Sequence, residues 1–307
     1  MAILVRPGGR VDRWRATLDP LLSGEDVRWW PEVGDPSEIE YLVAWRMDVD
    51  EFAPLVNLQA ILSLGAGTEQ WQRPGIPDVA VVRLADPAMA GEMAAYAIAW
   101  VVHHQRRFPE AAGHQRGHRW IQPDTIPTSD FHVGVLGYGE IGARIGGAFR
   151  DLGFAVNAWT RTRRTLSGVD HYVGPHELAD FLGASHAVVN VLPSTSETIG
   201  VLTPERLDAF RAGSLFVNIG RGTVLSSEAD LIAALDRGRP AAAVLDVTDP
   251  EPPSASSPLF DHPAVTLTAH TSGLTQIATA APLIAANLRR LRAGETPFPL
   301  LDRRLGY

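Results

Sequence analysis

Residues 133–142 read VGVLGYGEIG, an apolar strand-like run that leads directly into a glycine-rich turn and then into the helix pattern of 141–152. A backbone without Cβ atoms can turn tightly, let a diphosphate come close and let the helix pack on the strand. Strand, glycine turn and helix in this order predict a dinucleotide site. Its candidate residues are Gly137, Tyr138, Gly139, Glu140, Ile141 and Gly142.

Short apolar runs that are each followed by helix-like sequence recur on both sides of this turn. Such alternation favours an α/β fold of two Rossmann-like lobes with doubly wound parallel sheets and a cleft between them. We expect a substrate-binding lobe over 1–98 plus 275–307 and a dinucleotide-binding domain over 99–274. The expected strands are 3–5, 41–44, 60–64 and 79–82 in the first lobe, and 133–136, 155–160, 187–191, 215–218, 241–245 and 265–267 in the second.

Three segments link or follow these runs. The apolar stretch 89–108 ends in His and Arg, which predicts a buried helix between the lobes. The stretch 111–130, with two glycines and two prolines, predicts a surface excursion. The helical pattern of 274–291 is expected to pack back on the first lobe.

The second strand of the dinucleotide fold ends without the acid that would bind the ribose of NAD. Residues 152–169 contain neither Asp nor Glu, while three arginines follow the strand in 161–164. Guanidinium groups suit a 2′-phosphate by charge and geometry, so we expect NADP(H) in preference to NAD(H), with NAD(H) as the alternative. A merely solvated arginine loop is the other interpretation. The candidate contacts are Thr160, Arg161, Thr162 and Arg163.

Three polar residues follow later strands of the same sheet. Arg221 lies in NIGRG, Glu251 in DVTDPEP and His270 in TAHTSG. Taken singly, each has an ordinary structural interpretation, but together they suit chemistry on a 2-keto acid. The Arg would hold the carboxylate, the His would protonate the carbonyl oxygen, and the Glu would keep the His charged.

Composition excludes several classes of protein. The 307 residues carry a net charge of −8, with 27 basic residues, all of them Arg, against 35 acidic ones, which disfavours a nucleic-acid partner. The absence of Lys excludes Schiff-base and P-loop lysines, and the absence of Cys excludes disulfides and thiolate ligands. No apolar run is long enough for a membrane span, and the expected location is cytoplasmic, with no metal.

Five motifs in order, LGAGT at 64–68, GYGEIG, NIGRG, LDVTDPEP and TAHTSG, resemble those of the D-isomer-specific 2-hydroxyacid dehydrogenases, most closely the glyoxylate/hydroxypyruvate reductase A branch. The resemblance covers essentially the whole chain. It implies that Arg221 anchors the substrate carboxylate and that Glu251 partners the acid/base His270. It implies substrate contacts at Trp45, Arg46, Gly65, Ala66 and Gly67, and cofactor contacts at Leu192, Pro193, Ser194, Ile219, Gly220 and Asp246.

The chain departs from the branch at two places. Ala269 stands where the family usually has Pro, and Arg46-Met47-Asp48 where the branch usually has His-Pro-Pro. The second departure alters the pocket wall and so bears on the substrate. We expect an NADPH-dependent reductase of glyoxylate or hydroxypyruvate, and the resemblance implies that it pairs as a homodimer through 89–108 and 111–130. The alternatives are a dinucleotide-sensing scaffold of the same fold or an NAD-dependent enzyme for another 2-hydroxy acid.

Overall fold

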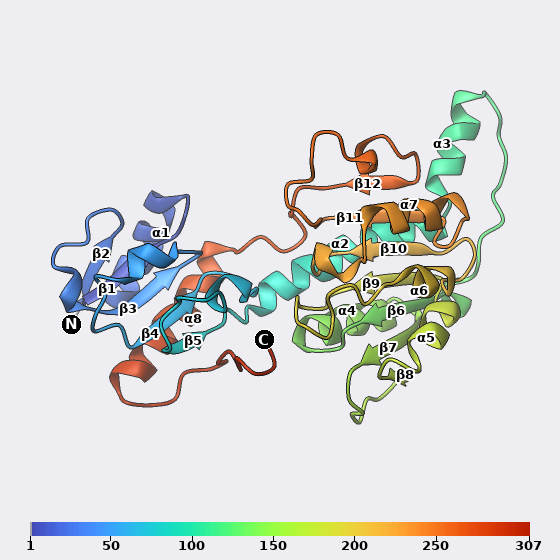
Figure 1. Ribbon diagram of the computed structural model, residues 1–307. Coiled ribbons are helices and arrows are strands. Elements are labelled where there is room, and N and C mark those ends of the chain that lie inside the picture. The colour runs from blue at the N-terminus through green and yellow to red at the C-terminus, as the bar shows by residue number, and fades with distance from the viewer. Residues whose placement is uncertain (1) are drawn as a thin grey trace. The chain divides into compact units, whose positions relative to one another are not determined.

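The computed structural model describes residues 2–307, which divide into two compact units. The first unit consists of the described residues up to Met89 together with Thr275–Tyr307, and the second of Ala90–Leu274. Each unit has one sheet, whose paired strands all run parallel (Figure 1). The predicted α/β fold is confirmed.

The first unit has a five-stranded sheet in the order β2-β1-β3-β4-β5. Its strands are β1 (Ala2–Arg6), β2 (Asp26–Trp29), β3 (Ile39–Ala44), β4 (Ala60–Ser63) and β5 (Ala80–Val82), and its helices are α1 (Val11–Leu18) and α8 (Ile277–Arg292). Ala281 and Ile284 of α8 share a core with Ile3 of β1, so the last helix packs on the first unit, as predicted.

The second unit has a seven-stranded sheet in the order β12-β11-β10-β9-β6-β7-β8. This order reverses between β6 and β9, the place where ligands bind at the carboxyl ends of such sheets. The strands are β6 (His132–Leu136), β7 (Ala155–Thr160), β8 (Asp170–Val173), β9 (Ala187–Asn190), β10 (Leu215–Asn218), β11 (Ala242–Leu245) and β12 (Val265–Leu267). The helices are α2 (Pro87–Gln105, begun in the first unit), α3 (Phe108–Arg116), α4 (Glu140–Asp151), α5 (Leu178–Ala184), α6 (Pro204–Asp208) and α7 (Glu228–Asp236).

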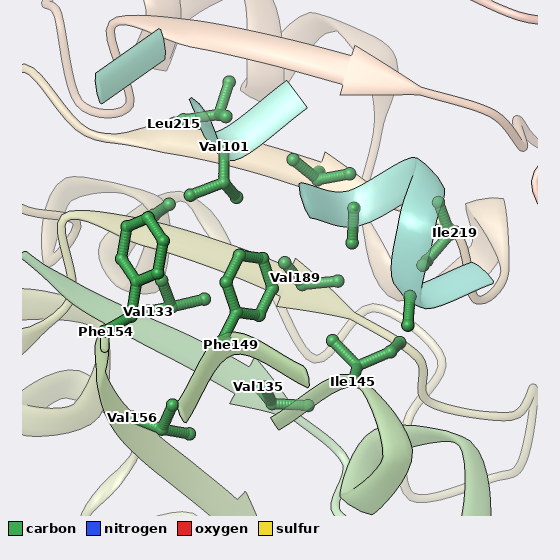
Figure 2. Close-up of a cluster of buried hydrophobic side chains, with 14 of the residues drawn as sticks. Val101, Val133, Val135, Ile145, Phe149, Phe154, Val156, Val189, Leu215 and Ile219 are labelled. Atoms are coloured by element: carbon green, nitrogen blue, oxygen red, sulfur yellow. The ribbon is translucent and has the colours of Figure 1, made fainter. Parts of the chain in front are cut away.

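Helices cover both faces of this sheet, because successive strand residues point to opposite sides. Val133 and Val135 of β6 join Val101 of α2 and Phe149 of α4 in one core (Figure 2). Leu136 joins residues of α5, α6 and α7 in a second core. A fully buried side chain such as Phe149 contributes roughly 1.5–3 kcal/mol to stability. The sheet is therefore doubly wound, as predicted.

Three predictions need correction. The strands β2 and β8 were not predicted, because each mixes charged or polar residues with its apolar ones, as DVRW and DHYV, and so forms no apolar run. The helix expected over 89–108 ends at Gln105, and Arg107 has a φ of +56° that breaks it from α3. The segment 111–130 lies at the surface as expected, with no buried residue, but it begins as helix α3, whose Pro109 lies at its start, where proline is tolerated.

Candidate functional site

The glycine turn between β6 and α4 has the form that a diphosphate requires. Gly137 has a φ of +99°, and a Cβ on Gly142 would lie 2.0 Å from the Gly137 carbonyl oxygen. At Gly139 a Cβ would meet nothing within 4 Å. Among the described residues no side chain caps the twelve-residue helix α4 there. Its first amides are thus open to an anion, which fits the predicted cofactor.

Tyr138 of this turn is turned into the protein. Its side chain is buried, and a Cβ on Gly146 would come within 2.5 Å of its hydroxyl oxygen. Burial raises the pKa of the Tyr138 phenol. The side chain therefore packs the turn on α4, and a cofactor contact by Tyr138 stays a prediction for its backbone.

The loops after β9 and β10 meet the glycine turn. A Cβ on Gly137 would lie 3.0 Å from Cδ2 of Leu192, and a Cβ on Gly220 would lie 2.8 Å from the Leu192 carbonyl oxygen. The Thr223 hydroxyl donates a hydrogen bond to the Ser194 hydroxyl at 2.9 Å. The structure therefore brings together three of the segments that were predicted to bind the cofactor.

Two buried asparagines at the ends of β9 and β10 fix these loops. Asn190 donates from Nδ2 to Oδ1 of Asn218 at 2.8 Å and accepts from the Leu192 amide at 3.1 Å. Asn218 donates in turn to the Arg221 carbonyl at 3.0 Å. Sequence reasoning did not single out this pair. The available signal was a polar residue that closes each of two apolar strands.

The arginines after β7 are exposed and have acidic neighbours. Nη1 of Arg161 lies 2.6 Å from Oε2 of Glu197, and Nη2 of Arg163 lies 3.5 Å from Oε1 of Glu177. Exposed ion pairs of this kind contribute only about 0–1 kcal/mol to stability, so a phosphate can replace the glutamates as partner of the arginines. The Thr160 hydroxyl, by contrast, is buried and donates to the Thr162 carbonyl at 2.8 Å.

His270 and Glu251 form a hydrogen-bonded pair, with Nδ1 of the imidazole 2.7 Å from Oε1 of the carboxylate. An ionised carboxylate can only accept, so Nδ1 carries the proton and Nε2 is left for a ligand. Each side chain is 43% exposed, which leaves the pair accessible. The backbone of His270 has a φ of +51°, a left-handed conformation that costs a residue with a side chain roughly 1–3 kcal/mol.

Arg221 lies in a loop that touches the segment leading to Glu251. A Cβ on Gly222 would lie 2.0 Å from the carbonyl carbon of Thr248, so the two loops pack backbone against backbone. Nη1 of the half-buried Arg221 donates to the Gly220 carbonyl at 2.7 Å. The structure thus brings the arginine loop against the glutamate loop, and Glu251 against His270.

Asp246 lies at the end of β11 and is only 1% exposed. Its Oδ1 accepts from the Thr268 hydroxyl at 2.5 Å and from the Thr271 amide at 2.8 Å, and its Oδ2 accepts from the Ser272 amide at 2.9 Å. Burial alone would raise the pKa of Asp246, but the hydrogen bonds from Ser272, Thr268 and Thr271 outweigh it and hold that pKa below its usual value. The predicted contact of Asp246 with a nicotinamide amide stays a prediction.

In the first unit, the predicted substrate residues lie at the ends of β3 and β4. A Cβ on Gly65 would lie 2.5 Å from the ring of Trp45, so ring and loop are in direct contact. Nε2 of Gln70, which sequence reasoning missed, lies 3.1 Å from the Trp45 carbonyl and 3.3 Å from the Gly67 carbonyl. Arg46 is exposed beside this cluster. The substrate roles of these residues stay predictions.

Within residues 2–307 no group of three or more His, Asp or Glu side chains is arranged to hold a metal ion. In the same range no helix has both the length and the apolar character needed to span a membrane.

Comparison with known proteins gives consistent matches. A family model described as D-isomer specific 2-hydroxyacid dehydrogenase, NAD binding domain, matches residues 98–272. A glyoxylate/hydroxypyruvate reductase A of Salmonella paratyphi B is 34% identical over 301 residues, which cover 96% of each chain. The structure of a D-isomer specific 2-hydroxyacid dehydrogenase from Xanthobacter autotrophicus Py2 in complex with NADPH and MES superposes with a TM-score of 0.94 at 37% identity, covering 100% of this chain and 99% of that one. An NADPH-dependent glyoxylate/hydroxypyruvate reductase from Sinorhizobium meliloti in complex with NADP and sulfate has a TM-score of 0.92 at 26% identity, with coverage of 100% and 99%.

Proposed function

Since the chain belongs to the D-isomer specific 2-hydroxyacid dehydrogenase family, we propose that it reduces a small 2-keto acid, glyoxylate or hydroxypyruvate, to the D-2-hydroxy acid with NADPH. The family makes it an NAD(P)-dependent oxidoreductase. The observation that carries the proposal is the 2.7 Å bond between His270 and Glu251 on loops that follow the strands of a dinucleotide fold.

The residues of the second unit divide the chemistry among them. The guanidinium of Arg221 binds the substrate carboxylate, for which its planar fork is suited. Nε2 of His270 delivers a proton to the keto oxygen, and Glu251 holds Nδ1 so that the ring keeps its orientation. Bound NADPH supplies the hydride that the carbonyl carbon receives. The hydride and the proton together convert the carbonyl group to the alcohol.

The preference for NADPH rests on the charge that follows β7. Arg161 and Arg163 are exposed there, and residues 152–169 supply no carboxylate to bind the ribose hydroxyls of NADH. A 2′-phosphate carries more negative charge than either Glu197 or Glu177 and presents oxygens to both guanidinium groups. The Xanthobacter and Sinorhizobium relatives, solved with NADPH and NADP, support the same choice.

We also propose that the chain forms a homodimer through α3 and the segment that follows it. Trp120 is 102% exposed, and Phe108, Ile121 and Ile126 are exposed as well. Four exposed large apolar side chains on one segment favour burial of that segment against a second copy of the chain. Light scattering after gel filtration should give twice the chain mass for the natural protein and a lower mass for Trp120→Ser. A monomeric natural protein would contradict the dimer.

The test of function is a panel of 2-keto acids assayed with NADPH and with NADH, following loss of the reduced cofactor. Glyoxylate and hydroxypyruvate should be reduced, and NADPH should give the higher kcat/KM. His270→Ala should lower kcat by about 10²–10⁴-fold, the usual contribution of a general acid. His176→Ala, an exposed histidine elsewhere in the second unit, is the matched control. Turnover of His270→Ala at the natural rate would refute the role of His270.

A further inference from the structure

A chain of hydroxyl groups joins helix α2 to the loop that carries His270. The Tyr96 hydroxyl lies 2.7 Å from the Thr268 hydroxyl, which donates to Oδ1 of Asp246 at 2.5 Å. Thr268 has one hydroxyl proton, which it uses in the hydrogen bond to Asp246. The Tyr96 hydroxyl must therefore be the donor to the Thr268 oxygen. Burial raises the pKa of the Tyr96 phenol, which remains a donor at neutral pH.

At the end of this series of hydrogen bonds, Asp246 holds the backbone of His270 and of the two residues that follow it. The main-chain carbonyl of Asp246 accepts from the His270 amide at 2.9 Å. Its carboxylate accepts from the next two amides, those of Thr271 at 2.8 Å and Ser272 at 2.9 Å. One buried aspartate therefore receives three successive amides.

Such anchoring is what the conformation of His270 requires. Its φ of +51° is unfavourable for a residue with a side chain and persists only where the surroundings hold it. The bond from Nδ1 to Glu251 orients the ring but does not hold the backbone. The backbone is held by Asp246. Oδ1 of Asp246 accepts a hydrogen bond from the Thr268 hydroxyl, which in turn accepts one from Tyr96.

We propose that Tyr96 and Thr268 are positioning residues, which keep Asp246 fixed and thereby hold His270 where its imidazole can donate to substrate. The inference rests on the proposed function, because it assigns His270 as the proton donor. It goes beyond the proposed function, because that function assigns no role to Tyr96 or Thr268.

The first experiment needs no activity. Hydrogen exchange of the Thr271 and Ser272 amides is measured by mass spectrometry on peptides that cover 268–274, in the full natural protein and in Tyr96→Phe. Exchange should be faster in the variant by about 2- to 10-fold, the range that one hydrogen bond supplies on balance. Tyr172→Phe, a tyrosine of β8 in the same unit, is the control and should leave this peptide unchanged.

The second experiment is a double-mutant cycle on the rate. Tyr96→Phe should lower kcat by about 2- to 10-fold while the KM values for keto acid and NADPH stay within about twofold. Thr268→Val should lower kcat further, and Thr268→Ser, which keeps the hydroxyl, should restore most of it. Because Tyr96 acts only through Thr268, adding Tyr96→Phe to Thr268→Val should cost nothing more.

The outcomes separate the two proposals. Unchanged exchange and unchanged kcat in Tyr96→Phe would overturn the positioning role, as would full additivity in the double variant. If Thr268→Val does not fold, the exchange and kcat of Tyr96→Phe together with Thr268→Ser decide the question. If the natural protein reduces no 2-keto acid, the proposed function fails, and the exchange rates alone decide whether Tyr96 orders the loop.

Discussion

Replacement of Asp246 by Asn exchanges one carboxylate oxygen for an NH2 group in the residue that binds the amides of the His270 loop. Both carboxylate oxygens accept hydrogen bonds, so the new NH2 group must face a donor on either side. Facing Ser272 is the less costly choice, since Oδ1 accepts from both Thr268 and Thr271. The loss of one charge-assisted bond, roughly 1.5–3 kcal/mol, and a buried donor left unpaired, roughly 1–3 kcal/mol, add to roughly 2.5–6 kcal/mol.

Thermal unfolding followed by calorimetry measures this loss. At roughly 2–4 °C per kcal/mol for a unit of this size, Asp246→Asn should lower the transition of the second unit by about 10 °C. Asp261→Asn, an exposed carboxylate in the same unit, should shift it little.

The pH dependence gives an independent check. Because the pKa of Asp246 is lowered in the folded protein, its contribution is present above the pKa of an unfolded carboxyl, about 3.9, and is lost as pH falls through the folded value. The difference between natural protein and Asp246→Asn should be constant above about pH 5 and shrink below about pH 4. A shift of less than about 2 °C at pH 7, equal to that of Asp261→Asn, would refute the reasoning.

Three further perturbations have defined outcomes. Gly142→Ala places a Cβ 2.0 Å from a backbone oxygen and should weaken NADPH binding by at least about tenfold, as measured by quenching of tryptophan fluorescence. The control Gly147→Ala, whose Cβ would meet nothing within 4 Å, should leave NADPH binding unchanged. Gly65→Ala places a Cβ 2.5 Å from the Trp45 ring and should raise the keto-acid KM, so an unchanged KM would remove this loop from substrate binding. Burial, together with the nearby charge of Arg211, lowers the pKa of His186 from 6.5 to about 4. The folded protein therefore favours the neutral ring, and its stability should fall as the pH drops from 6.5 to 4. The free energy of unfolding, measured by urea titration, should fall by up to about 3 kcal/mol over this range in the natural protein and not in His186→Asn. The same dependence of unfolding free energy on pH in both proteins would contradict the prediction.

The elements that sequence predicts well are those with strong local patterns. The strands β7, β10 and β12 were predicted to the residue, since each is a short run made largely of apolar residues, although only β10 is buried along its whole length. The edge strands β2 and β8 are short and partly exposed, and only their pairing with β1 and β7 makes them strands. Helix α3 was missed because its Gly113, together with Gly117 and two prolines further along the chain, was interpreted as a turn signal.

The same distinction holds for the candidate site. The pairing of His270 with Glu251 was predicted from chemistry and family motifs, and the structure places them in contact. The contact of Tyr96 with Thr268 spans 172 positions, and that of Arg161 with Glu197 spans 36. No local pattern encodes such separations, because they follow from the order of strands in the sheet.

The left-handed backbone at residue 270 also determines how an inactive form of the enzyme should be made. Among residues with a side chain, histidine and asparagine occur in this region more often than most, so asparagine adds less strain there than alanine does. Asn at this position removes the proton donor yet keeps a side chain that accepts the local geometry. A crystallographer seeking a ternary complex that does not turn over should therefore begin with His270→Asn and reserve the alanine form for kinetics.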